Sequence, residues 1–160
     1  MMKRKILLAS SSPRRVVLMK EAGISFEQHF PTEVDETRIE GESAENYVKR
    51  LAFEKAKSGL TQHTQCCVIG ADTVVIAPNG DILGKPKDRD EAFMMLMKLQ
   101  GNTHQVITAY AILWENHKVV RSVLSLVQFR NLSSIAIDSY LDNYDEWKDK
   151  AGSYAIQGIG

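Results

Sequence analysis

The stretch Ile6-Leu7-Leu8-Ala9-Ser10-Ser11-Ser12-Pro13-Arg14-Arg15 predicts a short buried strand that leads directly into a helix. The apolar residues favour the strand, Ser12 is a good helix N-cap, and a proline suits the first helical position. Arg14 and Arg15 follow in the first turn, although a helix N-terminus already carries partial positive charge. This placement indicates either an anion site made of backbone N–H groups and guanidinium groups, or a solvated strand–helix connection. The glycines of a Walker loop are missing, so the class of anion stays open.

The bulk composition limits the class of protein. The chain has 160 residues, a length typical of a single domain with a substantial core. Lys and Arg number 20, as do Asp and Glu, so a general affinity for nucleic acid or membranes is not expected. The sequence shows no apolar run as long as a membrane span, and its first residues run into a strand rather than a signal segment. Cys66 and Cys67 read as buried thiols of a reducing compartment, which predicts a cytoplasmic protein.

Capping residues, glycines and hydrophobic periodicity predict the other elements. Helices are expected over residues 13–22, from the N-cap Ser43 through Ser58, over residues 88–99, and from Ser133 or Ser134 through Tyr144. Strands are expected over residues 24–30, 66–76, 82–86, 104–114 and 119–130, the last two as an antiparallel pair. This order is typical of an α/β or α+β domain with a mixed, largely antiparallel twisted sheet flanked by helices.

Two groups of carboxylates are candidates for chemistry. Glu33, Asp35 and Glu36 lie close together ahead of a polar stretch, which reads either as a solvated loop or as a site for Mg²⁺ or Mn²⁺. Asp72 interrupts a continuous apolar run, where an ionised carboxylate is costly unless it is paired or bound to metal. We interpret Asp72 as a general base or metal ligand, with a structural hydrogen-bonding role as the alternative. Gly70, on the same face, leaves room for a bulky group to approach.

Several cations could face such a site. Lys55 falls inside the apolar stripe of its predicted helix, so it either snorkels to solvent or points into a cleft toward phosphate. Lys85 follows a short strand and is a second candidate, and Lys150 lies in a glycine-containing loop that could close over an anion. Gln157 adds an amide with a donor end and an acceptor end. His104 stands alone, without a partner at metal-ligand spacing, and is interpreted as structural.

Together these residues suit phosphoryl transfer, in which cations bind a polyphosphate and carboxylates hold a divalent metal and activate water. A constellation for covalent catalysis through serine, cysteine or histidine is not evident. The sequence resembles the Maf (septum-formation-inhibitor-like) family of nucleoside triphosphate pyrophosphatases over essentially its whole length. The matching motifs include Leu8–Arg15, Val34–Glu36, Glu54–Ala56, Ile69–Val75, Gly84–Pro86, His104–Ala109 and Asp149–Gly158.

The resemblance implies hydrolysis of a nucleoside triphosphate to the monophosphate and pyrophosphate, with a divalent metal, in a cleft between two lobes. Asp72 would accept the proton, and Asp35, Glu36 and Asp72 would face the metal. The implied phosphate-binding and substrate-binding residues are Lys55, Lys85, Ser10, Ser12, Arg14, Arg15, Thr73, Lys150 and Gln157. Within the family, the ending with Lys150 and Gln157 resembles the dTTP/UTP branch. An amide can pair with the edge of a uracil or thymine ring, which agrees with that resemblance.

The resemblance also implies a homodimer. Residues 1–160 are expected to form one Maf-like domain without the family's C-terminal segment, which continues past this point with a strand pair and a last helix. Two other functions are compatible with the sequence: a non-catalytic nucleotide-binding regulator linked to cell division, and the same reaction on 7-methyl-GTP.

Overall fold

The computed structural model describes residues 4–31 and 34–158, so Glu33 of the predicted acidic site lies outside the described residues. The strands are β1 (Ile6–Ala9), β2 (Glu27–His29), β3 (Cys67–Ile76), β4 (Ile82–Leu83), β5 (Thr103–Trp114) and β6 (His117–Gln128). The helices are α1 (Pro13–Glu21), α2 (Ala44–Gln62), α3 (Arg89–Leu99), α4 (Ser134–Asn143) and the short 3₁₀ helix η1 (Ala151–Ser153). None of the helices within the described ranges is long and apolar enough to cross a membrane.

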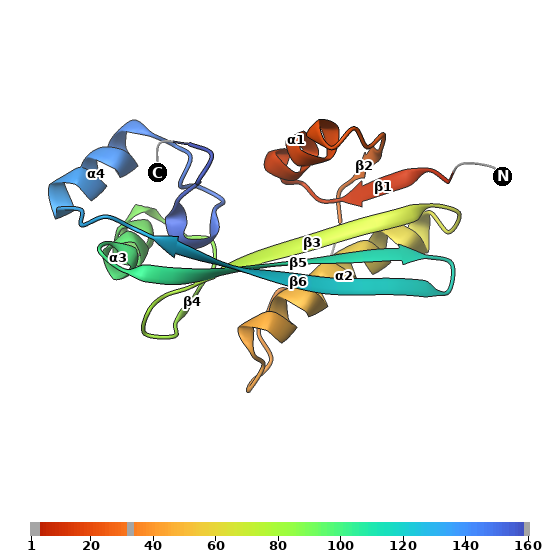
Figure 1. Cartoon of the computed structure of the whole chain (residues 1–160), viewed down its shortest axis with the longest axis horizontal. Helices are drawn as coiled ribbons and strands as arrows, with labels where there is room; N and C mark the ends of the chain where they lie inside the picture. The colour runs from red at the N-terminus through yellow and green to blue at the C-terminus, as the bar shows by residue number, and fades with distance from the viewer. Residues whose placement is uncertain (1–3, 32–33, 159–160) are drawn as a thin grey trace. The chain divides into compact units, whose positions relative to one another are not determined.

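The strands form one mixed sheet, which confirms the predicted fold class. Its order is β2-β1-β3-β5-β6, with β4 paired to β3. β1 runs parallel to both β2 and β3, whereas β4 runs antiparallel to β3. The long strands β5 and β6 run in opposite directions and are joined by a tight turn (Figure 1).

The chain divides into two compact units. The first comprises Met1–Asp72 and Thr108–Val123, and the second comprises Thr73–Ile107 and Leu124–Gly160. The boundary therefore falls inside β3, β5 and β6, each of which contributes residues to both units.

In the first unit, helix α2 packs against the sheet at two glycines. A Cβ atom at Gly70 would lie 2.3 Å from the carbonyl oxygen of Ala52 and 2.5 Å from the amide nitrogen of Ala56. The bulky group that Gly70 admits is therefore the backbone of α2 itself. The sequence predicted that this helix ends at Ser58, just before Gly59, and that prediction is wrong, because α2 continues to Gln62. Gly59 is buried, and a Cβ there would approach Val68 to 2.9 Å, so its role is close packing rather than helix termination.

Local capping signals are confirmed for three helices and only partly for the first. Ser43, Asp88 and Ser133 each accept a hydrogen bond from a backbone N–H in the first turn of α2, α3 and α4. Ser12 occupies the N-cap position of α1, but its side chain makes no capping bond. Instead, the amide of Ser12 donates to the hydroxyl of Ser10 over 3.2 Å.

The second unit is built around a core that includes Val75, Leu96, Leu99, Ile137 and Trp147. His104 lies inside this unit with 1 % of its surface exposed. Its Nε2 atom is 2.7 Å from the hydroxyl of Tyr154, and its ring makes edge contacts with Phe129 and Tyr154. Burial lowers the pKa of His104 and raises the pKa of Tyr154 to about 12. These contacts agree with the structural interpretation of His104.

The burial of His104 predicts that the free energy of unfolding falls as the pH drops below about 6.5, the ordinary histidine pKa. The unfolded chain then takes up a proton that the folded chain resists, because the pKa of His104 is lower in the folded state. Urea unfolding at pH 7.5 and pH 5.5 gives the free energy of unfolding at each pH. H104Q should reduce the difference between these two free energies. Part of the difference should remain, since burial also lowers the pKa of His29.

Y154F is the matched control, because it removes the hydrogen bond to His104 while the ring stays buried. It should lower stability at both pH values and leave the difference between them unchanged. An undiminished difference in H104Q would contradict the prediction.

Candidate active site

The first turn of α1 is tied to β3 by Arg15. Its Nη1 atom donates to the carbonyl oxygen of Ala71 over 2.8 Å and to the hydroxyl of Ser10 over 3.2 Å. Ser10 is buried, with 3 % of its surface exposed, and follows the last residue of β1. Burial lowers the pKa of Arg15, an effect that the carboxylate of Asp72 opposes, and the guanidinium remains charged. The predicted anion-binding stretch is therefore held beside Asp72, and Arg14 is half-buried in the same turn.

A lysine bridges two of the predicted carboxylates. The Nζ atom of Lys55 lies 2.7 Å from Oδ1 of Asp72 and 2.7 Å from Oε1 of Glu36. Lys55 reaches this position from α2, Asp72 from β3, and Glu36 from the loop before α2. The side chains of Lys55 and Asp72 are 15 % and 13 % exposed, whereas that of Glu36 is 53 % exposed. Lys55 therefore points inward toward two carboxylates and does not snorkel to solvent.

The electrostatics of this cluster suit a proton acceptor. Burial raises the pKa of Asp72, although the Lys55 ammonium and the Arg15 guanidinium oppose the shift. For Lys55, burial lowers the pKa, but the carboxylates of Asp72 and Glu36 outweigh it, and the net shift is upward. The ammonium thus keeps its proton, while Asp72 is more basic than an ordinary aspartate. A carboxylate with a raised pKa is better matched to accepting a proton near neutral pH.

The cluster also has the donor atoms for a divalent cation. Carboxylate oxygens suit Mg²⁺, which is commonly bound through one or two carboxylates together with substrate phosphates and water. Glu36 and Asp72 meet this description, since both already face the positive charge of Lys55. In the part of the chain that the structure describes, His, Cys, Asp and Glu side chains do not gather in threes around a possible metal. A complete ion shell would therefore need oxygens from the substrate and from water.

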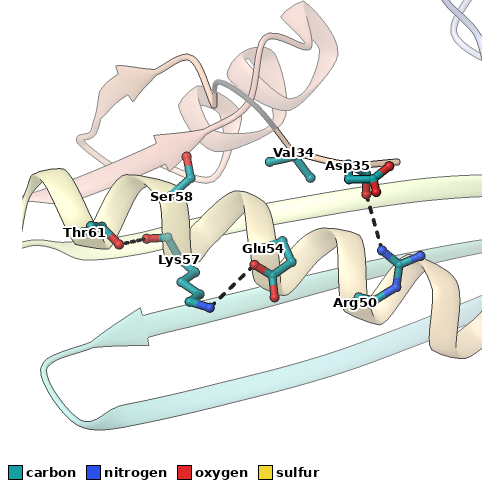
Figure 2. Close-up of a pocket in the computed structure, with 7 residues that line it drawn as sticks. All are labelled: Val34, Asp35, Arg50, Glu54, Lys57, Ser58 and Thr61. Carbon is teal, nitrogen blue, oxygen red and sulfur yellow. Dashed lines mark hydrogen bonds and ion pairs between the residues drawn. The ribbon is translucent and has the colours of Figure 1, made fainter. Parts of the chain in front are cut away.

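Asp35 lies apart from this pair. Its Oδ1 atom accepts a hydrogen bond from the amide of Thr37 over 2.9 Å, and the residue is exposed. Asp35 instead lines a shallow pocket of about 430 Å³ beside α2 (Figure 2). The other residues that line this pocket are Val34, Arg50, Glu54, Lys57, Ser58 and Thr61.

The second unit carries the remaining predicted residues. Thr73 directly follows Asp72 on β3 and is half-buried, and Lys150 is half-buried at the start of η1. Lys85 and Gln157 are exposed. The amide of Gly152 donates to the carbonyl oxygen of Gly84 over 3.1 Å. This bond places the segment that contains Lys150 beside the segment that contains Lys85. Two lysines far apart in the sequence are thus carried by neighbouring segments of this unit.

The turn at Gly152 is sterically demanding. Gly152 has a φ of 71°, and a Cβ there would meet the side chain of Val75 at 3.0 Å. Asp149 and Ser153 also adopt positive φ, at 57° and 65°, which is uncommon for residues other than glycine. Buried contacts of Ser153 and Tyr154 hold this turn in place.

Sequence reasoning did not single out two residues on α2, Tyr47 and Arg50, whose side chains bind the loop that carries Glu36. Both donate side-chain hydrogen bonds to backbone carbonyl oxygens of that loop. The sequence signal for these two residues is weak, because a tyrosine and an arginine on a polar helix face are common. Only the position of the loop relative to α2 reveals the contact.

Known proteins resemble this chain over almost its whole length. The family model described as Maf-like protein matches residues 5–160. A dTTP/UTP pyrophosphatase of Clostridioides difficile (strain 630) is 46% identical over 157 residues, which cover 97% of this chain and 79% of that protein. A dTTP/UTP pyrophosphatase of Escherichia coli (strain K12) is 46% identical over 156 residues, covering 97% of this chain and 78% of that protein.

The fold resembles a solved structure at much lower sequence identity. The Ham1 protein of Staphylococcus aureus aligns with a TM-score of 0.55 and 12% identity, covering 78% of this chain and 71% of that one. This likeness shows a shared fold alone. The family assignment rests on the sequence matches, which include the segments that carry Arg15, Lys55 and Asp72, and by these matches the chain belongs to the Maf family.

Proposed function

We propose that this protein hydrolyses dTTP and UTP to the nucleoside monophosphate and pyrophosphate. The observation that carries the proposal is the buried Asp72 carboxylate held by Lys55, in a chain 46% identical to proteins named dTTP/UTP pyrophosphatase. A buried carboxylate that is ion-paired and more basic than usual is a good acceptor for a proton from water. This activity would remove such nucleotides, including modified pyrimidine nucleotides, from the cellular pool.

In the proposed reaction, a water oxygen bonds to the α-phosphorus and one of its protons passes to Asp72. The bond between the α-phosphorus and the oxygen that bridges to the β-phosphorus breaks, and pyrophosphate leaves with that oxygen. Positive groups must neutralise the charge that develops on the leaving group. Arg14, Arg15 and Lys55 of the first unit serve this purpose in our proposal.

Lys85 and Lys150 are the phosphate-binding cations of the second unit, and Ser10 and Ser12 line the phosphate path in the first. Mg²⁺ or Mn²⁺, held by Glu36 and Asp72, would supply additional charge neutralisation when bound. Asp35, also expected to face the metal, is left out of this set because its carboxylate is turned toward Thr37. Thr73 and Gln157 select the base, together with Arg14. An amide matches the donor and acceptor edge of uracil or thymine, which favours these pyrimidines.

The proposal extends to the state of the protein in the cell. Residues 1–160 act as one Maf-like domain, and two chains associate as a homodimer, as the family resemblance implies. The free thiols Cys66 and Cys67 are compatible with the reducing cytoplasm.

Product analysis tests the proposed function. Incubation with dTTP or UTP and Mg²⁺ or Mn²⁺ should yield the monophosphate and pyrophosphate, which ion-exchange chromatography separates from diphosphate and orthophosphate. Diphosphate with orthophosphate would contradict cleavage at the α-phosphorus. In competition, 7-methyl-GTP should be consumed more slowly than UTP, and the reverse preference would contradict the choice of base.

A further inference from the structure

The loop that carries Glu36 is bound to α2 at consecutive backbone carbonyl groups. Arg50 donates from Nη1 to the carbonyl oxygen of Asp35 over 3.4 Å and from Nη2 to that of Thr37 over 2.9 Å. Between them, the hydroxyl of Tyr47 donates to the carbonyl oxygen of Glu36 over 2.8 Å. Figure 2 shows Arg50 reaching from the helix to the segment at Asp35. The backbone on both sides of Glu36 is therefore held by side chains from one helix face.

Arg50 is itself held rigidly. Its Nε and Nη2 atoms donate to the two carboxylate oxygens of Glu42 over 2.8 Å and 2.9 Å, a bidentate pair. The carboxylate of Glu42 is only 9 % exposed and also accepts from the amide of Ile39 over 3.3 Å. The guanidinium lies 5.6 Å from the ring centre of Tyr47. Arg50 thus joins the backbone at Asp35 and Thr37 to Glu42, which lies near the end of the loop.

This restraint matters because of where Glu36 points. Its side chain is 53 % exposed, and burial alone would not select one orientation. Its carboxylate nevertheless meets Lys55 at 2.7 Å, beside Asp72. We propose that Arg50 and Tyr47 are positioning residues, which hold the loop backbone so that the Glu36 carboxylate faces Lys55 and Asp72. The inference rests on the proposed function, because it assigns Glu36 to the reacting site.

A double-mutant cycle separates positioning from a general contribution to folding. A misplacement of about 1 Å can cost about a hundredfold in rate, so we expect kcat/KM for dTTP to fall about tenfold in Y47F and about a hundredfold in R50Q. If Tyr47 acts through Glu36, adding Y47F to E36Q should cause no further loss of kcat/KM. The Y47F change removes one hydroxyl and keeps the ring beside Arg50, so the variant should fold normally. Full additivity of Y47F and E36Q would overturn the proposal.

Amide hydrogen exchange provides a readout that does not depend on activity. In R50Q, the amides of Thr37 and Ile39 should exchange at least about tenfold faster than in the wild type, because the loop opens locally. K49Q is the matched control, since Lys49 lies on the same helix and pairs with Glu45 over 2.6 Å, away from the loop. Equal exchange rates in R50Q and the wild type would overturn the proposed restraint. A wild type that folds but does not hydrolyse dTTP would instead refute the proposed function, and the exchange data would still decide whether the loop is held.

Discussion

D72N is expected to lower kcat for dTTP hydrolysis by about a thousandfold, within the range found when a general base is removed. Asparagine has nearly the same shape as aspartate, and its amide oxygen can still accept the hydrogen bond that Lys55 makes over 2.7 Å. It cannot, however, take a proton from water at any ordinary pH. The variant should therefore fold and lose the chemical step.

Binding and folding measurements distinguish loss of the chemical step from loss of folding or of nucleotide binding. Calorimetric titration with dTTP in the absence of divalent metal should give a dissociation constant close to that of the wild type, since the phosphate-binding cations are unchanged and the metal that Asp72 would hold is left out. D90N is the matched control, because Asp90 is an exposed aspartate of the first turn of α3 and should retain full activity. Wild-type activity in D72N would show that Asp72 is not the proton acceptor.

The largest effect on stability is expected for G70A, which should reduce the free energy of unfolding by about 3 kcal/mol. The added methyl group would lie 2.3 Å and 2.5 Å from the backbone oxygen of Ala52 and the backbone nitrogen of Ala56. Backbone atoms cannot move aside as a flexible side chain can, so the whole of α2 must shift away from β3. Because Lys55 lies on the same segment of α2, the pairing with Asp72 should suffer as well.

Urea unfolding measures this change, with G84A as the control. A Cβ at Gly84 would meet nothing within 4 Å, so G84A should change the unfolding free energy only slightly. A urea midpoint for G70A equal to that of the wild type would show that α2 and β3 are not packed as closely as described.

Local signals in the sequence predicted much of the fold. The N-caps Ser43, Asp88 and Ser133 each mark the start of a helix, because a side-chain acceptor near a free N–H works regardless of tertiary contacts. The continuous apolar run around Val74 predicted β3, because a strand covered on both faces needs apolar residues along most of its length. The end of α2 was missed, because burial of Gly59 against the sheet outweighed its local tendency to end a helix.

The site was predictable residue by residue but not as an arrangement. The inward position of Lys55 and the burial of Asp72 each stood out against their apolar neighbours, yet nothing in the sequence said that they would pair over 2.7 Å. Asp35 and Glu36 are adjacent and looked equivalent, whereas the backbone turns the Asp35 side chain toward Thr37 and the Glu36 side chain toward Lys55. Such differences depend on the path of the loop, to whose carbonyl groups Arg50 donates hydrogen bonds.

The decisive measurement is hydrolysis of dTTP in water labelled with heavy oxygen, followed by mass spectrometry of both products. If water attacks the α-phosphorus with the help of Asp72, the label should appear in the monophosphate and the pyrophosphate should remain unlabelled. Label in the pyrophosphate would mean that water attacks the β-phosphorus, and the proposed mechanism would be wrong.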